Sequence, residues 1–304
     1  MARTLAVNVD VDGLPLYYRI HGLSCDPMLS EHGALAAVAW ERGVRRFLEL
    51  FGTLGLRATF FVVGRDLAHP AVRSVAADAV RLGHELASHS HTHPYNLIHL
   101  KPSRIREEIA LAEHAIEAVR GAPVRGFRGP GYNINAEVLE TLGERGYLYD
   151  SSILPSPAYY AARALAITAI GLRGRTSQSI VGDPLAALGR RGPYRLQRGR
   201  LLELPITVLP LLRVPVIGTS LALTPTPVLA HVLAPALRRM NFVNLEFHAM
   251  DLLDATDPGC EALARYQPDV TVPVGDKRTR YATVLRHLSE GADNQTLEAI
   301  AQSF

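Results

Sequence analysis

Cysteine is scarce in this sequence: Cys25 and Cys260 are the two cysteines among 304 residues. They show no metal-type or redox spacing, which excludes a disulfide-rich scaffold and a zinc ribbon and fits a reducing compartment. No apolar run reaches the length that a membrane-spanning helix needs. The N-terminal residues also lack the apolar region of a secretory signal, so we expect a cytoplasmic protein.

The sequence also lacks a strong excess of charge of either sign. Its net charge is +3 with histidine neutral, which is too small to favour nucleic acid as a partner. Hydrophobic residues make up 48% and charged residues 20% of the chain, an ordinary balance for a folded globular protein. The length suits one large α/β domain or two small ones, and we expect a single domain over residues 1–304.

Strand-like and helix-like patterns alternate along the chain. Short β-rich runs predict strands at 4–10, 57–63, 85–88, 124–127, 147–149, 201–206 and 242–247. Helical spacing of apolar residues predicts helices at 34–54, 70–82, 102–120, 135–144 (with Asn135 as the cap), about 277–290 and about 294–302. Residues 14–32 lack periodicity and are predicted to form a loop, and residues 155–200 look like an insertion. The alternation implies βαβ units and a parallel sheet.

Three histidines lie within five residues, directly after the predicted strand 85–88. Neutral imidazole is the commonest protein ligand for a catalytic divalent metal, and three protein ligands leave such a site open to water. A solvated, His-rich loop would give the same local pattern. Carboxylate and acid–base residues elsewhere in the chain are needed to distinguish a metal site from a solvated loop.

Polar residues that can do chemistry follow five of the predicted strands. These residues are Asp10 and Asp12, His89 and His93, Arg128, Asp150, and His248. In a parallel barrel the carboxyl ends of the strands converge on one rim, where active sites lie. The pattern therefore predicts one shared site rather than five unrelated surface loops.

At the level of motifs, the chain resembles the polysaccharide deacetylases, the NodB-homology group of metal-dependent carbohydrate N- and O-deacetylases. The motifs are Asp-Val-Asp, Ala-Thr-Phe-Phe, His-Ser-His-Thr-His-Pro, Phe-Arg-Gly-Pro-Gly-Tyr, Tyr-Asp-Ser-Ser and a late Phe-His. They occur in the order of that family and span residues 4–251. The resemblance implies an α/β fold, namely an irregular (β/α)₇ barrel, and a site with one aspartate and two histidines as metal ligands.

The resemblance also implies a role for each matching residue. His89 and His93 match the two histidine ligands, Asp12 the metal-binding carboxylate and Asp10 the catalytic base. Two carboxylates are needed because one stays on the metal while the other takes a proton from the attacking water. Alternation along a strand puts both on the same side. His91, between the two ligands, is expected to point away.

Three further positions complete the expected site. Arg128 matches the arginine that orients the base, and it should hold Asp10 ionised. His248 matches the histidine that protonates the leaving amine, although a core histidine at a strand end would look the same. A backbone N–H near Gly131 or Tyr132 is expected to stabilise the oxyanion, with the assignment uncertain by one residue.

The sequence departs from the family pattern in two places. The first motif has a residue between its two aspartates, a form that resembles a branch with intracellular deacetylases and lipid-linked aminoarabinose deformylases. The residue that tunes the acid histidine is missing after Asp150-Ser-Ser152, and Asp251 or Asp254 could substitute for it. Asp150 itself could contact substrate or merely cap its strand. Zinc is the expected ion for an Asp-His-His site, and manganese, cobalt or nickel could occupy the same ligands.

The stretch 201–237 is unusually apolar and rich in proline, which precludes one continuous helix. Together with residues 159–172 it could form an apolar lip beside a basic cluster. The cluster has one acid, Asp183, against eight arginines: Arg163, Arg173, Arg175, Arg190, Arg191, Arg195, Arg198 and Arg200. Such a lip suits peripheral contact with an anionic membrane at its inner face and a lipid-linked, phosphate-bearing sugar. Normal packing or a contact between subunits of a homo-oligomer would look the same.

These observations favour a metal-dependent hydrolase that removes an acetyl or formyl group from the nitrogen of an amino sugar, either lipid-linked or part of a cell-envelope glycan. One alternative is an amidohydrolase that acts on a small non-sugar amide. Another is an inactive module that binds carbohydrate or lipid. The complete set of expected catalytic residues speaks against the inactive module.

Overall fold

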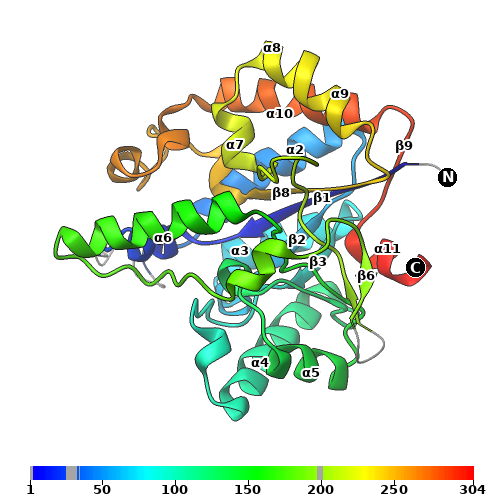
Figure 1. Ribbon diagram of the computed structural model, residues 1–304. Coiled ribbons are helices and arrows are strands. Elements are labelled where there is room, and N and C mark those ends of the chain that lie inside the picture. Colours follow the sequence, from blue (N-terminus) through cyan, green and yellow to red (C-terminus); the bar gives the residue numbers. More distant parts are fainter. Residues whose placement is uncertain (1–2, 25–32, 34, 197–200) are drawn as a thin grey trace.

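The computed structural model describes residues 3–24, 33, 35–196 and 201–304, and it has a central sheet with helices around it (Figure 1). The strands are β1 (Arg3–Val11), β2 (Thr59–Val62), β3 (Glu85–Ser88), β4 (Gly126–Phe127), β5 (Tyr149–Asp150), β6 (Tyr194–Arg195), β7 (Leu202–Glu203), β8 (Phe242–His248) and β9 (Ala292–Asn294). The α-helices are α1 (Leu14–Ile20), α2 (Arg45–Leu54), α3 (Pro70–Arg81), α4 (Pro102–Arg120), α5 (Ala136–Glu144), α6 (Pro157–Leu172), α7 (Gly218–Leu223), α8 (Thr226–Val228), α9 (Ala234–Leu237), α10 (Val274–Ser289) and α11 (Leu297–Ser303).

The strand order is β6-β7-β5-β4-β3-β2-β1-β8, with β9 paired to β1. All of these pairs are parallel except β6 with β7. The segment after β7 reaches β8, because the Thr207 N–H donates to the Asn244 carbonyl (3.0 Å) and the Asn244 N–H donates to the Thr207 hydroxyl (2.7 Å). These contacts bring the two edges of the parallel sheet together. The predicted irregular (β/α)₇ barrel is confirmed.

Strand β1 shows how the sequence divides the two faces of the sheet. Val7 and Val9 are fully buried in the large core that the strands share with the surrounding helices. The intervening residues Asn8, Asp10 and Asp12 are buried as well, on the opposite side of the strand. The inside of the barrel near its carboxyl end is therefore polar, whereas the layer between strands and helices is apolar.

Helix α11 closes the other end of the barrel. Leu297 and Ile300 pack against Phe61 and Tyr149 inside the ring of strands. The first turn of α11 also contacts a buried carboxylate, because the Glu298 N–H donates to Glu85 (3.0 Å). With this end filled, the carboxyl ends of the strands are the open end, as expected for a site of this fold class.

Most predicted elements are present. Helix α4 has the predicted bounds, and the Asn135 side chain caps α5 by accepting the Val138 N–H (3.0 Å). The predicted loop at 14–32 is wrong in its first part, because α1 occupies Leu14–Ile20 with proline in its first turn and five buried residues. Seven residues are too few to show a clear helical period.

Three other expectations need a correction or lie outside the structure. The helix expected at 34–54 begins as a π-helix over Ala39–Val44 before α2. The insertion-like segment 155–200 contains α6 and β6. Cys25, Arg198 and Arg200 lie outside the described residues. Across the described ranges, no helix is both long and apolar enough to cross a bilayer.

Candidate active site

Strands β1 and β8 position four acidic and basic side chains at the open end of the barrel. Their parallel register places Asn8 beside Glu246 and Asp10 beside His248. Because side chains alternate along each strand, residues two apart share a face. Asp10 on β1 and Asp12 directly after its end thus project from the same side, next to Glu246 and His248 of β8.

Asp12, His89 and His93 form a buried group whose ligand atoms lie within 4.8 Å of one another. Asp12 Oδ1 is 3.5 Å from Nε2 of His89 and 3.3 Å from Nε2 of His93. Neither Asp12 Oδ1 nor either ring nitrogen of His93 has a hydrogen-bond partner in the described part of the chain. Buried polar atoms without partners are rare, so this arrangement fits a site for a divalent cation.

The protonation of the two histidines also suits a metal. Burial lowers the pKa of His89 to about 4 and that of His93 to about 3, so both rings are neutral near pH 7. Nδ1 of His89 lies 2.7 Å from the Arg128 carbonyl oxygen. Since a carbonyl can only accept, Nδ1 carries the proton and Nε2 keeps its lone pair for a ligand.

The loop after β3 is held in an unusual conformation. Ser90 and His93 have positive φ angles of 61° and 56°, which are uncommon for residues with a side chain. Glu108 of α4 holds this loop by accepting the His91 N–H (3.1 Å), the Thr92 N–H (2.8 Å) and the Thr92 hydroxyl (2.7 Å). The histidine ligands are therefore placed by a braced loop rather than by the strand alone.

His91 lies apart from the metal-binding group. A Cβ atom added to Gly64 would sit 3.0 Å from its Nδ1, so the ring packs against the start of a 3₁₀ helix (Gly64–Ala68). The His91 ring thus points away from the two ligand histidines, as expected from the sequence.

Arg128 is fully buried beside Asp10. Its Nη1 donates to Asp10 Oδ1 (2.6 Å) and to Asn8 Oδ1 (2.6 Å), while Nε and Nη2 donate to Ser151 (both 2.8 Å). The guanidinium carbon also lies 4.1 Å from the centre of the Phe61 ring. Burial raises the pKa of Asp10, but Arg128, with smaller contributions from His89 and His248, outweighs that effect and leaves the pKa below its usual value. Asp10 is therefore ionised near pH 7.

Glu246 is a site residue that the sequence analysis missed. Its Oε1 lies 3.2 Å from Nδ1 of His248 and accepts a hydrogen bond from the Tyr132 hydroxyl (2.8 Å). Burial alone would lower the pKa of His248, but Glu246, Asp10 and neighbouring carboxylates raise it to about 9. Burial raises the pKa of Glu246 itself to about 7. Glu246 could have been found from the alternating sequence Asn-Leu-Glu-Phe-His in β8, because alternation puts Glu246 on the same face of the strand as His248.

The two aspartates considered earlier, Asp251 and Asp254, differ in their relation to His248. Asp251 accepts the backbone N–H of His248 (2.7 Å), and its own pKa is raised to about 6 by burial. Asp254 instead accepts from the Thr256 N–H and hydroxyl and from the Val274 N–H. Asp251 does contribute to the raised pKa of His248, as expected, but Glu246 raises that pKa more, and Asp254 is not among the groups that raise it.

The remaining predicted residues divide between the cavity and the core. Asp150 is fully buried, and its carboxylate accepts from Ser152, an arrangement that corresponds to a strand cap rather than to substrate contact. Gly131 and Tyr132 line the cavity and both have positive φ, 60° and 62°. The Tyr132 N–H already donates to the Gly129 carbonyl (2.9 Å), which leaves Gly131 as the stronger candidate of the two for a free donor.

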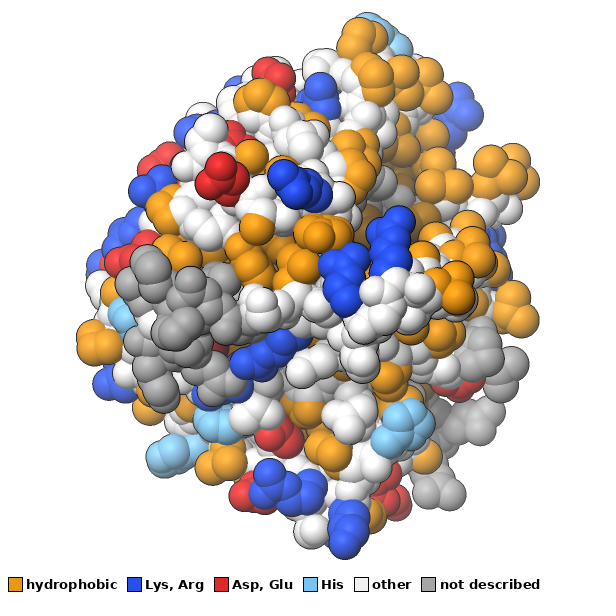
Figure 2. All heavy atoms as spheres, turned by 90° about the vertical axis from the view of Figure 1, so that its left-hand side faces the viewer, with side chains coloured by type: hydrophobic (Ala, Val, Ile, Leu, Met, Phe, Trp, Pro, Cys, Tyr) orange, Lys and Arg blue, Asp and Glu red, His pale blue; other side chains and the backbone are white. Residues whose placement is uncertain are grey.

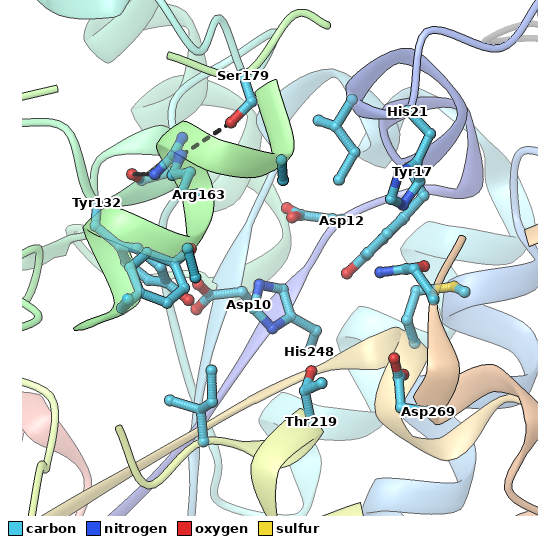
Figure 3. A pocket seen from close by; sticks show the side chains of 18 of the residues that line it. Asp10, Asp12, Tyr17, His21, Tyr132, Arg163, Ser179, Thr219, His248 and Asp269 are labelled. Atoms are coloured by element: carbon cyan, nitrogen blue, oxygen red, sulfur yellow. Dashed lines mark hydrogen bonds between the residues drawn. The ribbon is translucent and has the colours of Figure 1, made fainter. Parts of the chain in front are cut away.

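These groups open into a cavity of about 650 Å³, which is within the usual range for small-molecule sites. Figure 3 shows Asp10, Asp12 and His248 pointing into it, with the Tyr17 hydroxyl approaching from another side. Helix α6 forms much of one wall. One cavity is thus lined by two members of a candidate metal site, by an ionised carboxylate and by a histidine that is protonated near pH 7.

Residues 37–149 match the family model described as polysaccharide deacetylase. Over these residues the chain is similar to the polysaccharide deacetylase family. Two curated proteins to which the chain is similar are a bifunctional xylanase/deacetylase of Pseudobutyrivibrio xylanivorans and the peptidoglycan deacetylase-like protein FGM2 of Gibberella zeae. The first is 30% identical over 31% of this chain and the second 27% identical over 49%. These matches span 15% and 43% of the relatives' own lengths.

Solved structures show the same fold. One is assigned as a polysaccharide deacetylase from Mycobacterium smegmatis. The alignment covers 100% of this chain and 91% of that chain, with a TM-score of 0.64 and 20% identity. Another is the PuuE allantoinase, for which the alignment covers 99% of this chain and 90% of that chain, with a TM-score of 0.57 and 16% identity. At these identities the likeness establishes the architecture and leaves the substrate to the chemistry of the site.

Proposed function

We propose that this protein is a metal-dependent hydrolase that removes an acetyl or formyl group from the nitrogen of an amino sugar. The observation that carries the proposal is the Asp10–Arg128 ion pair, because its Asp10 lines one cavity together with protonated His248 and with Asp12 and His89 of the candidate metal site. Amide hydrolysis needs both a base that stays ionised and an acid that stays protonated at the same pH, and this cavity supplies both.

Asp12, His89 and His93 would hold the cation, which would supply positive charge at the amide carbonyl and favour ionisation of a nearby water. Asp10 accepts the proton of the attacking water, because Arg128 keeps its carboxylate ionised and fixes its orientation. His248 then donates its proton to the departing nitrogen. The C–N bond breaks, and the products are a carboxylate and a free amine.

A backbone donor completes the proposed site. The carbonyl of Gly131 is held by Nη1 of Arg163 (2.7 Å), and the positive φ at Gly131 turns the peptide at the cavity wall. We assign the stabilisation of the oxyanion to the Gly131 N–H, because that of Tyr132 is used in a turn. Any larger residue at 131 would collide with Arg163 and Tyr95, since an added Cβ would lie 2.6 Å and 2.9 Å from their atoms.

The direct test is release of acetate or formate from a panel of N-acyl amino sugars, free and lipid-linked, by enzyme of known metal content. Turnover that disappears with a chelator and returns with zinc, manganese, cobalt or nickel supports the proposal and names the ion. Bound metal without turnover of any amide would favour an inactive binding module.

A small non-sugar amide is the second candidate substrate. It is favoured by the apolar side chains along one side of the cavity and by the architecture shared with an allantoinase. Allantoin and simple acetamides therefore belong in the same panel, and preferential turnover of these compounds would assign the site to that chemistry.

Replacing Glu246 should change the pH dependence of the reaction. The His248 acid is active when protonated, so activity falls as pH rises through its pKa of about 9. Glu246→Gln removes a carboxylate that raises this pKa, while Asp10, Asp12 and Asp251 remain. We expect the alkaline limb of the kcat/KM profile to move to lower pH. Asp254→Asn is the matched control, and an unmoved limb in Glu246→Gln would exclude Glu246 as the tuning residue.

Peripheral contact with an anionic membrane is part of the same proposal. Leu165 and Leu172 of α6 are 72% and 85% exposed, and the exposed Arg173 follows the helix directly. Figure 2 shows hydrophobic side chains gathered beside Lys and Arg on the face toward which α6 extends. The protein should float with vesicles of anionic phospholipid at low salt and less so at high salt. Failure to float with anionic vesicles at low salt would contradict the contact, and neutral vesicles provide the control.

A further inference from the structure

Helix α6 is apolar on every side although it lies largely outside the core. Its sequence, PAYYAARALAITAIGL, has one charged residue, Arg163, and Tyr160 is its only buried residue. A helix that is hydrophobic all round normally lies inside a protein or against another apolar phase. In Figure 1 it projects beyond the barrel, beside α1. The cost of exposing such a helix to water suggests that its surface has a binding role.

One side of α6 forms a wall of the active-site cavity. Ala162, Ala166, Ile167 and Ile170 all line the cavity, and their spacing of four, one and three residues puts them on one face of the helix. Other apolar residues complete this wall from separate elements, namely Ile20 of α1, Leu223 of α7, Ile217 and Met250. The wall is therefore assembled from several parts of the fold.

The position of α6 relative to the catalytic groups is fixed by Arg163. Its Nη1 donates to the Gly131 carbonyl (2.7 Å) and its Nε donates to the Ser179 hydroxyl (2.9 Å), as drawn in Figure 3. Because Gly131 belongs to the catalytic rim, the apolar wall and the reacting groups are held together. A group bound along α6 would therefore share one cavity with the amide that reacts.

Another part of the cavity offers polar groups that suit a sugar. The Tyr17 hydroxyl and Gln267 Oε1 are buried, line the cavity and have no hydrogen-bond partner among the described residues. Tyr17 is 6% exposed. Asp269 lines the same part of the cavity. Sugar hydroxyls can satisfy such donors and acceptors, which cost free energy when they stay unpaired.

We propose that the α6 wall binds an apolar group carried by the substrate, so that the enzyme acts on amphiphilic N-acyl amino sugars. The inference rests on the function proposed above and specifies its substrate class. Two types of substrate would carry a hydrocarbon chain near the amide. The chain is the aglycone of the sugar in one type and a long acyl group in the other. A bare polysaccharide is polar throughout and would leave this wall in contact with water.

The test compares methyl and octyl glycosides of N-acetylglucosamine, with N-octanoylglucosamine as a second arm, below micelle-forming concentrations. Each methylene removed from water contributes roughly fourfold in affinity. We expect kcat/KM for the octyl glycoside, or for the octanoyl amide, to exceed that of the methyl glycoside of N-acetylglucosamine at least tenfold. The substrate with the higher kcat/KM, octyl glycoside or octanoyl amide, shows whether the hydrocarbon chain is the aglycone or the acyl group. Equal values in all three would overturn the inference while leaving the proposed hydrolase intact.

Two substitutions on the same helix sharpen the comparison. Ile170→Asp puts a charge on the cavity wall and should bring the octyl-to-methyl ratio close to one. Ala169→Asp puts the same charge on an exposed position outside the cavity lining and should leave the ratio unchanged. Circular dichroism and the melting temperature check that both variants fold. An unchanged ratio in Ile170→Asp would contradict the role of this wall.

The test also works if the proposed hydrolysis fails. Should no N-acyl sugar be turned over, calorimetric titration with octyl glucoside still reports on the wall alone. Binding by the unmodified protein and by Ala169→Asp, with at least tenfold weaker binding by Ile170→Asp, would support an apolar site. Absence of binding to the unmodified protein would overturn it.

Discussion

Asp10→Asn is expected to lower kcat by about two to four orders of magnitude, the usual contribution of a general base. The amide keeps the size of the side chain and can still contact Arg128, but it cannot accept a proton from water. Asp10 is not part of the group of three ligands, so the variant should still bind metal. Steady-state rates on an N-acyl sugar and metal analysis of the same preparation measure both effects.

Controls for Asp10→Asn are available on the same strand. Asn8→Ala removes another partner of Arg128, and it should affect stability more than chemistry. If Asp10→Asn kept a rate near that of the unmodified protein, the base would have to be another group. If it lost metal as well, Asp10 would have to be counted among the ligands.

His89→Ala is expected to abolish stable metal binding and, with it, turnover. The variant removes one of three ligands, and even the loss of a group that merely orients a ligand typically costs 10–100-fold in metal affinity. The loss should therefore exceed that range. Elemental analysis after dialysis, together with rates at increasing added metal, measures it.

His91→Ala is the matched control for His89→Ala. It removes an imidazole from the same loop, and its ring lies beside Gly64, away from the ligand group. We expect this variant to keep its metal and its activity. Equal metal loss in both variants would mean that the effect comes from the loop as a whole rather than from ligation by His89.

The barrel could be predicted from sequence because its signals are local. Alternating strand and helix patterns specify βαβ units, and the carboxyl ends of parallel strands have to meet at one rim. That rule predicted a shared site for Asp10, Asp12, His89, His93, Arg128, Asp150 and His248. The structure places all of these except Asp150 around one cavity or directly beside it. The bounds of helix α4 followed from the proline at its start and the glycine after its end.

What could not be predicted depends on contacts between distant segments. Helix α1 is too short to show a period, and its stability comes from burial against other parts of the chain. Glu246 was missed because the role of a carboxylate inside a strand can be recognised only from the side chains that it contacts, here His248 and Tyr132. The burial of Asp150 depends on Ser152 and on the adjoining strand, neither of which a linear pattern can place.

The pairing of β8 with β1 divides the chemistry of the site between two regions of the chain. The three candidate metal ligands all come from the first third of the sequence, whereas the proton donor His248 arrives on a strand near its end. Contacts of such high sequence separation are the slow ones in folding, and domains are synthesised from the N-terminus. Local opening of β8 would move His248 away from the site, so that it could no longer donate a proton. Asp12, His89 and His93 would stay in place, because β1 and the loop after β3 hold them. Ion affinity and turnover are thus expected to fail at different points of a denaturant titration, turnover first.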